Sequence, residues 1–433
     1  MAPAPRRPPQ DPAPSGISTL AVRLLVSAGM SCRRYIPLAA FLAACGTAAS
    51  PADAPAPSAA ESTAARTPLG SIAPPPPSAP PTAPAPRPVA SAFGALVGSL
   101  SEPNGPFFSD NIISNETSYL QVAAPLARAA APGGAYIGVG PEQNFTYIAL
   151  TRPKVAFILD IRRQNLVEQL LYKAIFAMAE TRSHFLALLV GRPWDKASDP
   201  GPSASIEAVI AHVEKSPPDE AAFAATHARL RAAIERDLRL DAEDKKTLEV
   251  THRAFFKGQL DVRFELKPPS GRHYPTLREL LTEKDPEGVA RGFLASEGAF
   301  RFVQAMEKEG RIVPVVGDFA GDRAMPGIAA YLAHEKLTVS AFYTSNVEQY
   351  LLEPKVWAKW ARNVAALPID DKSLFIRAYL DQGRRDPKEL SGHRTATVLQ
   401  RIADFEDRHA KKPFTSFWDV TTARLFDETT AVR

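Results

Sequence analysis

Short strand-like runs alternate with amphipathic stretches in two parts of the chain. Residues 135–139 and 155–159 are apolar at every position, which is typical of strands buried on both faces, and the helical pattern at 144–150 lies between them. The same rhythm returns later, where strand-like runs at 312–316 and 338–343 flank a helical pattern. Strands that alternate with helices in this way predict an α/β fold with a doubly wound, mostly parallel sheet.

The segment between the second and third predicted strands has helical periodicity throughout. Over residues 165–190, apolar side chains such as Leu166, Leu170 and Met178 recur at helical spacing. We therefore expect a helical insertion at about 183–310, between strands 2 and 3 of the sheet. Further helices are predicted at 112–130, 205–257 with a break at Pro217-Pro218, 274–281, 287–309, 324–334, 346–366 and 394–409, and a further strand at 373–379.

Residues 30–45 read MSCRRYIPLAAFLAAC and have the pattern of a secretion signal, in which two arginines precede an apolar stretch too short to cross a bilayer. The last four residues, Leu42-Ala43-Ala44-Cys45, resemble the lipobox of bacterial lipoproteins, where the cysteine is lipidated and becomes the new N-terminus. The resemblance implies a membrane anchor at Cys45, on the periplasmic or cell-surface face. Met30 is the expected start of the chain. Gly46 follows the cysteine instead of the Asp that retains such lipoproteins at the inner membrane, so the outer membrane is the preferred destination.

The composition divides the chain into three parts. Residues 1–45 form the predicted leader. Residues 46–94 are rich in proline and alanine, with four consecutive prolines at 74–77, and cannot bury a core, so we expect a disordered tether. The folded domain is then expected to span 95–433, which is long enough for one large core.

Charge and cysteine content narrow the classes of function. The net charge of +4 comes from residues 1–44, which carry five arginines and one aspartate, so the rest of the chain is neutral. Domains that bind nucleic acids normally carry a basic excess, and no nucleic-acid partner is expected. Both cysteines, Cys32 and Cys45, lie in the leader, which leaves the folded domain without a cysteine nucleophile or thiolate ligand. The eight histidines show neither HxH nor HExxH spacing, and no metal is expected.

Candidate chemistry is concentrated where the predicted strands end, because ligands of such sheets bind at the carboxyl ends of the strands. The first strand leads into a turn with Gly138 and Gly140, which allow the backbone to bend sharply and approach a ligand. Such a turn also occurs in domains that bind nothing. Asp160 ends the second strand. Its carboxylate has the capacity to accept two ribose hydroxyls, or instead to cap a helix or to pair with Arg162 or Arg163.

Several of these segments resemble motifs of class I S-adenosylmethionine-dependent methyltransferases. Residues 137–140 resemble the first motif of that family, and Asp160 matches its ribose-binding acid. Residues 316–319 resemble the third-strand motif, and 342–348 the fourth-strand segment that lines the methyl-transfer site. Over about 107–377 the chain is more closely similar to a family of uncharacterised bacterial proteins described as methyltransferase-like. The phrases that carry this second resemblance are FSDNIISNETSYL, YIGVGPEQNFTYIA, DIRRQNL, VPVVGDFAG and SNVEQYL.

The resemblance implies a pocket for S-adenosylmethionine. It places the methionine and ribose beside the glycine turn, the ribose hydroxyls on the acid of strand 2, and the adenine near the acid of strand 3. The chain departs from the family at Tyr136, which replaces an acid, and at Asn144, which replaces a glycine. The residues assigned to the cofactor are Gly138, Gly140, Glu142, Asn144, Asp160 and Asp318, and those assigned to the methyl acceptor are Tyr343, Ser345 and Asn346.

Three functions are consistent with these patterns. The first is a membrane-anchored lipoprotein whose methyltransferase-like domain binds S-adenosylmethionine or a related nucleoside, with or without catalysis. The second is a non-catalytic surface or periplasmic binding protein on the same fold, which the leader favours because S-adenosylmethionine is made in the cytosol. The third is a nicotinamide-dependent oxidoreductase, which shares the glycine turn and the acid.

Overall fold

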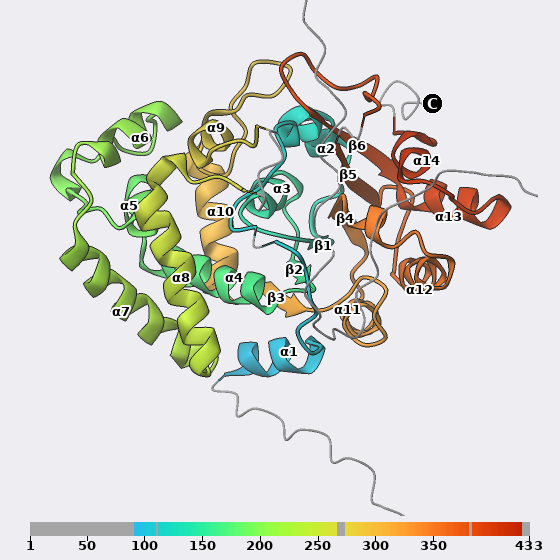
Figure 1. Ribbon diagram of the computed structural model, residues 1–433, viewed down its shortest axis with the longest axis horizontal. Coiled ribbons are helices and arrows are strands. Elements are labelled where there is room, and N and C mark those ends of the chain that lie inside the picture. Colours follow the sequence, from blue (N-terminus) through green and yellow to red (C-terminus); the bar gives the residue numbers. More distant parts are fainter. Residues whose placement is uncertain (1–90, 110, 266–272, 381–382, 427–433) are drawn as a thin grey trace, which may run out of the picture. The chain divides into compact units, whose positions relative to one another are not determined.

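The computed structural model describes residues 91–109, 111–265, 273–380 and 383–426 (Figure 1). The predicted leader with Cys45 lies outside the described residues, as does the predicted tether up to residue 90. The description begins with helix α1, Ala92–Leu100, which Ser91 caps by accepting a hydrogen bond from the Gly94 amide. None of the helices in the described ranges is both long and apolar enough to cross a membrane.

A six-stranded sheet in the order β3-β2-β1-β4-β5-β6 organises the described residues. The first five strands are parallel, and β6 runs antiparallel to β5. The predicted α/β class with a mostly parallel sheet is therefore confirmed. The strands are β1 Ala135–Gly138, β2 Val155–Asp160, β3 Ile312–Val316, β4 Val339–Ser345, β5 Leu374–Leu380 and β6 Thr395–Arg401.

The strand order reverses beside β1. From β1 the chain proceeds outward to β2 and β3 on one side, and then returns to place β4 and β5 on the other. The carboxyl ends of β1 and β4 are therefore the point at which an open α/β sheet offers a crevice for ligands. Every residue of β1, β2, β3 and β5 is buried, which explains why these strands are apolar on both faces.

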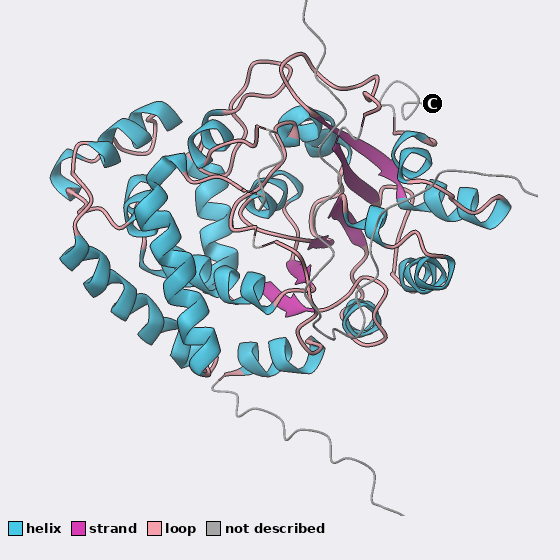
Figure 2. Ribbon diagram, viewed as in Figure 1, coloured by secondary structure: helices cyan, strands magenta, loops and turns pink. Residues whose placement is uncertain are grey.

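Helices cover both faces of this sheet (Figure 2). Several of those that lie between β2 and β3 in sequence, coloured green to yellow in Figure 1, are gathered on the side of the sheet nearer β3. Helix α4 packs against β2 and β3 and also against α7, α8 and α10, so it connects the sheet with this helical group. The helices between β2 and β3 are α4 Arg163–Met178, α5 Arg182–Val190, α6 Ile206–Glu214, α7 Glu220–Asp237, α8 Ala242–Gly258, α9 Leu277–Thr282 and α10 Glu297–Lys308.

Several predicted helices are confirmed, and their ends have recognisable local causes. The break predicted at Pro217-Pro218 separates α6 from α7. Capping boxes open α8 at Asp241 and α9 at Thr276, where side chain and backbone satisfy each other's unpaired groups. The remaining helices are α2 Ala123–Ala129, α3 Gln143–Thr151, α11 Ala324–His334, α12 Pro354–Ala365, α13 Ile402–Lys411 and α14 Phe417–Thr422.

Several of the predicted helices are wrong over part of their length. The helix predicted at 346–366 is divided into a short 3₁₀ helix, Val347–Tyr350, and α12, which begins at Pro354. Residues 287–296 are not helical, and α10 begins only after Ser296. Residues 112–118 are also outside any helix, because Ser114 accepts a hydrogen bond from the Glu116 amide and so competes with helical bonding. Residues 395–401 form strand β6 instead of the start of a helix, since they pair along their whole length with β5 and their threonines and valine suit a strand.

Candidate functional site

An N-terminal segment, residues 101–109 and 111–118 (called the 101–118 segment below), runs along the carboxyl edge of the sheet. It touches the ends of β3, β2, β1 and β4 in turn, so it covers the edge at which a ligand of this fold would enter. The contacts are Glu102 N to Val316 O at 2.7 Å, Gly105 N to Ile161 O at 2.9 Å, Ser114 N to the Glu142 carboxylate at 3.2 Å, and the Tyr343 hydroxyl to the Glu116 carboxylate at 2.7 Å.

The two glycines of the turn after β1 have different surroundings. A Cβ on Gly138 would clash with the Asn144 side chain and lie 2.8 Å from the Tyr136 hydroxyl, so glycine is required there by the protein's own packing. Gly140 has a φ of +80°, and a Cβ at this position would meet nothing within 4 Å. The open side of the turn is therefore at Gly140.

Asn144 and Tyr136, the two departures from the methyltransferase pattern, hold this turn from inside. The Asn144 amide nitrogen lies 2.8 to 3.1 Å from the carbonyl oxygens of residues 139, 140 and 141. Its Oδ1 accepts a hydrogen bond of 2.9 Å from the Tyr136 hydroxyl. Asn144 is fully buried, and these hydrogen bonds engage its side chain within the turn itself.

The Asp160 carboxylate at the end of β2 is engaged by Arg162. Its Oδ1 accepts hydrogen bonds from the backbone amide and Nε of Arg162, both at 2.9 Å, and its Oδ2 lies 2.7 Å from Arg162 NH2. Of the two arginines considered as partners, Arg163 pairs with Asp244 instead. Both oxygens of the predicted ribose acid are therefore already bonded.

Asp318 belongs to a separate local arrangement after β3. Its Oδ1 accepts a hydrogen bond from the Ala320 amide, and its own amide donates to Glu102. Glu102 also accepts from the amides of Arg323 and Ala324 and so caps α11. Among the contacts of the described residues, none joins the Asp318 side chain to the glycine turn.

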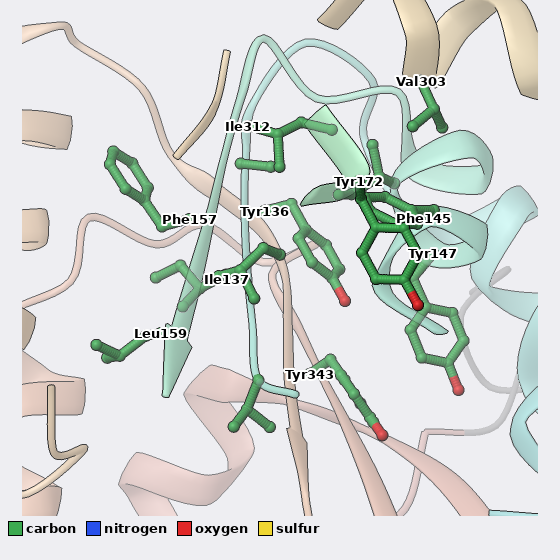
Figure 3. Close-up of a cluster of buried hydrophobic side chains, with 14 of the residues drawn as sticks. Tyr136, Ile137, Phe145, Tyr147, Phe157, Leu159, Tyr172, Val303, Ile312 and Tyr343 are labelled. Carbon is green, nitrogen blue, oxygen red and sulfur yellow. The ribbon is translucent and has the colours of Figure 1, made fainter. Parts of the chain in front are cut away.

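The predicted acceptor residues Tyr343 and Ser345 converge on Glu116, which the sequence analysis did not single out. Both hydroxyls donate to Glu116 Oε1, at 2.7 and 2.5 Å, and Gln143 donates to Oε2 at 2.9 Å. Burial raises the pKa of Glu116, against the effect of these hydrogen bonds. Figure 3 shows Tyr343 with Tyr136 and Tyr147 in the buried cluster beside β1.

Ser345 and Asn346 form a strained end to β4. Ser345 has a φ of +52°, a left-handed conformation that is uncommon for a residue with a side chain. Asn346 precedes the short 3₁₀ helix Val347–Tyr350 and accepts the Gln349 amide through its carbonyl. The Glu116 network therefore fixes the 101–118 segment to β4, and its hydroxyls are turned toward this carboxylate.

Glu142, predicted to contact the cofactor, lies immediately after the glycine turn. Its two carboxylate oxygens lie 3.2 and 3.3 Å from the Ser114 amide, so it also anchors the covering segment. Burial raises the pKa of Glu142 to about 7. At neutral pH this group therefore exchanges readily between its charged and neutral forms.

Helix α4 presents a buried polar face to the glycine turn. The spacing of three, four and seven residues from Asn165 places Glu168, Gln169 and Tyr172 on one side of the helix. Gln169 Nε2 donates to the Gly140 carbonyl at 3.0 Å, and Gln164 Nε2 donates to Glu168 Oε2 at 3.0 Å. The buried atoms of this face that have no hydrogen-bond partner are Gln164 Oε1, both Asn165 amide atoms, Glu168 Oε1 and Gln169 Oε1. The Tyr172 hydroxyl lies beside Glu168, and burial together with this carboxylate raises the pKa of Tyr172.

This polar face, defined by Gln164, Asn165, Glu168, Gln169 and Tyr172, was missed in the sequence analysis. The apolar side of the same helix, with Leu166 and Leu170, dominates the hydrophobic pattern. The signal that could have found it is the polar spacing within RRQNLVEQ, which is unusual for a helix surrounded by others.

Electrostatic interactions connect this face with the strand ends. Burial raises the pKa of Glu168 well above its usual range, with a further increase from Glu142 and Asp160 and a decrease from Arg162. Three carboxylates and one guanidinium therefore act on each other where β1 and β2 end. The arrangement offers many hydrogen-bond acceptors and few donors.

Two cavities of the described residues lie near this edge and at the opposite edge of the sheet. One of only about 10 Å³ is lined by Glu142, Thr146 and Phe293. A hollow of about 390 Å³ lies at the amino ends of the strands, beside Lys154 and Arg311. Among the described residues, no group of three histidine, cysteine, aspartate or glutamate side chains is placed to hold a metal ion.

The fold and the site define an α/β domain with a mostly parallel sheet and a polar, largely self-bonded carboxyl edge. The chain belongs to the family described as "Domain of unknown function (DUF7790)", whose profile matches residues 111–431. That range includes all the strands and the polar face of α4. No curated protein matches the chain.

Proposed function

We propose that this domain binds a small nucleoside-type ligand, with S-adenosylmethionine as the first candidate, at the carboxyl edge of β1 and β2. The observation that carries the proposal is the set of buried, unpartnered polar atoms on α4, next to the open side of Gly140. Each buried polar atom left without a partner costs about 1–3 kcal/mol. A ligand that bonds to several of them would offset that cost.

The choice of S-adenosylmethionine is supported by the resemblance to methyltransferases and by the compatible strand order, with its reversal beside β1. On this proposal the sheet is a methyltransferase-like Rossmann fold, and about 183–310 is a helical insertion within it. Gly140 would allow close approach of the ligand, and Asp160 would bind the ribose once Arg162 has moved. The α4 face would bind the remaining polar groups.

A non-catalytic role is the second candidate, and two observations favour it over methyl transfer. The hydroxyls of Tyr343 and Ser345 are bonded to Glu116, and Asp160 is bonded to Arg162. Neither arrangement leaves an evident general base facing a methyl acceptor. We therefore propose that the protein binds its ligand without catalysis. Observed turnover of S-adenosylmethionine would identify it as a methyltransferase instead.

Isothermal titration calorimetry on the full chain with Cys45→Ser tests the proposal. We expect S-adenosylmethionine and S-adenosylhomocysteine to bind at one site, and Asp160→Ala to weaken both. Binding of a nicotinamide dinucleotide alone would instead support the oxidoreductase alternative. An absence of heat with all of these ligands would reject both nucleoside proposals.

We further propose that the chain is a lipoprotein anchored in a lipid membrane through Cys45, with the outer membrane preferred. The support is the leader pattern that ends in Leu42-Ala43-Ala44-Cys45. Mass spectrometry of the N-terminus is the test, and we expect a lipidated Cys45 as the first residue. An unmodified chain that begins before Cys45 would reject the anchor.

A further inference from the structure

We infer that the ligand at the carboxyl edge carries an ammonium group, and that Glu168 and Asn165 on α4 bind this group. The inference rests on the proposed site and adds the charge of the ligand and the residues that recognise it. Glu168 is fully buried and Asn165 is 1% exposed, and both have unpartnered polar atoms. They lie one helical turn apart on α4.

The balance of charge at this edge favours a cation. Glu142, Asp160 and Glu168 interact electrostatically, and Arg162 is the one cation acting on Glu168 within the described ranges. Arg162 already contacts both oxygens of Asp160. Since a buried carboxylate is costly without a positive partner, an additional cation would stabilise the site.

The hydrogen-bonding capacity of the polar face also favours a donor. Four acceptor oxygens are buried there without a partner, one each from Gln164, Asn165, Glu168 and Gln169, against one unpartnered donor group, the Asn165 amide nitrogen. An ammonium group supplies three N–H donors and a positive charge together. A phosphate dianion would bring only further acceptors and no N–H donor.

The geometry places this group beside the turn after β1. Gln169 is bonded to the Gly140 carbonyl, so the polar face adjoins the residue whose Cβ side is open. Asp160 at the end of β2 is close enough to affect the charge of Glu168. A ligand could therefore place an ammonium group at α4 while its nucleoside extends toward Asp160.

Binding of an ammonium group should release a proton. Burial raises the pKa of Glu168 well above its usual range, and Glu142 and Asp160 act in the same direction while Arg162 opposes them. A bound cation stabilises the charged form of Glu168. The Glu168 carboxyl therefore loses its proton to the buffer, and the resulting carboxylate binds the ammonium group. A neutral ligand gives no such exchange.

Calorimetry on the full chain with Cys45→Ser, near neutral pH in two buffers of different ionisation enthalpy, measures this exchange. The probes are S-adenosylmethionine and S-adenosylhomocysteine, which carry an ammonium group beside a carboxylate, and 5′-methylthioadenosine, which lacks both groups and shares their nucleoside. Putrescine serves as an amine without a nucleoside. We expect the two ammonium-bearing nucleosides to bind about tenfold or more tightly than 5′-methylthioadenosine and to release a proton, as a charge-assisted bond requires.

Two variants identify the residue responsible. Glu168→Gln should abolish proton release and the tenfold preference while retaining 5′-methylthioadenosine binding. Glu307→Gln is the matched control, because Glu307 is another buried glutamate, on α10, whose pKa burial raises to about 8. It should leave binding unchanged. If Glu168→Gln does not fold, loss of the same preference in Asn165→Leu provides the test.

The possible results separate the inference from the proposed function. Equal binding of all three nucleosides without proton release would overturn the inference and leave the nucleoside site standing. Binding of putrescine alone, with proton release that Glu168→Gln abolishes, would support the ammonium site and overturn the nucleoside proposal. Binding of none of the four probes would overturn both.

Discussion

Arg162, two residues after Asp160, binds both oxygens of the Asp160 carboxylate, with Nε 2.9 Å from Oδ1 and NH2 2.7 Å from Oδ2. Both side chains are almost completely buried, at 10% and 5% exposure. The carboxylate that ends β2 is thus neutralised by its own neighbour before any ligand arrives. Binding of ribose at this position requires the arginine to give up at least one of these contacts.

Replacing Arg162 should therefore increase the sensitivity of the site to ribose hydroxyls. In Arg162→Met, Asp160 is left free to accept from the ligand, and a hydrogen bond to a charged acceptor contributes about 1.5–3 kcal/mol. We expect the difference in affinity between 5′-methylthioadenosine and its 2′-deoxy analogue to widen about tenfold or more in calorimetry. Asp160→Asn is the control and should narrow that difference. An unchanged difference in Arg162→Met would show that Asp160 does not face the ribose.

The two glycines of the turn should respond differently to alanine. Gly138→Ala would force the methyl group against Asn144 and Tyr136, and such overpacking costs about 1–3 kcal/mol in the free energy of unfolding. Gly140→Ala meets open space and should cost only about 1 kcal/mol, from its left-handed φ. Urea unfolding of both variants measures the two costs. A larger loss for Gly140→Ala would contradict the assignment of the open side of the turn.

Features set by local pattern were predictable from the sequence. Helix α11 and strand β3 have the predicted bounds, because amphipathic spacing and a run of buried apolar residues are each visible in a short window. Strand β6 was missed because its identity depends on pairing with β5, which no local pattern reveals.

In the candidate site, too, the features set by local sequence were predictable and those set by distant contacts were not. The glycine turn and Asp160 were found because their residue types follow strand ends. The pairing of Asp160 with Arg162 was one of several alternatives, and only the folded geometry selects it. Glu116 and the α4 polar face were missed, since their importance comes from burial by segments far away in the sequence.

Asn165 should limit the stability of the free protein. Neither of its amide atoms has a partner, although the residue is buried. Asn165→Leu, which keeps a similar shape, should raise the free energy of unfolding by about 1–3 kcal/mol. It should also weaken ligand binding.

A second buried asparagine provides the control for this prediction. Asn363 donates to the carbonyls of Phe319 and Gly321, both at 2.8 Å, so Asn363→Leu should destabilise the protein by a similar amount. Urea unfolding without ligand distinguishes the two substitutions. If Asn165→Leu were as destabilising as Asn363→Leu, the amide group of Asn165 would have to be hydrogen-bonded in the free protein.

The Glu348–Arg377 pair, at β4 and β5, should make a large contribution to the free energy of unfolding. Both side chains are buried, with Nε 2.5 Å from Oε2 and NH2 3.0 Å from Oε1, and Trp360 also donates to Glu348. Removing one partner of such a pair typically costs about 3–5 kcal/mol. We expect this loss in Glu348→Leu, and a substantial recovery in the double variant with Arg377→Met. A double variant no more stable than Glu348→Leu would show that the charge left behind is not the cause.

His252 should make the protein sensitive to acid. Its Nε2 lies 3.0 Å from the Leu188 carbonyl and must donate there, so its Nδ1 accepts from His227 Nδ1 at 3.2 Å. Burial lowers the pKa of His252 from 6.5 to about 4, with smaller effects of the same sign from His227 and Arg253. Between these two values the unfolded chain takes up a proton that the folded protein does not. The contribution of neutral His252 to the free energy of unfolding is therefore complete above pH 6.5 and is lost as the pH falls toward 4.

The loss should amount to about 3 kcal/mol in the free energy of unfolding over that interval. Urea unfolding at several pH values measures it, and His252→Gln, which keeps a neutral hydrogen-bonding side chain, should show a correspondingly smaller loss. His334→Gln is the control, because the His334 side chain is 85% exposed and its replacement should leave the acid sensitivity unchanged. Identical pH dependence in His252→Gln and the unmodified protein would mean that His252 is already protonated when folded, in conflict with its donation to Leu188 and acceptance from His227.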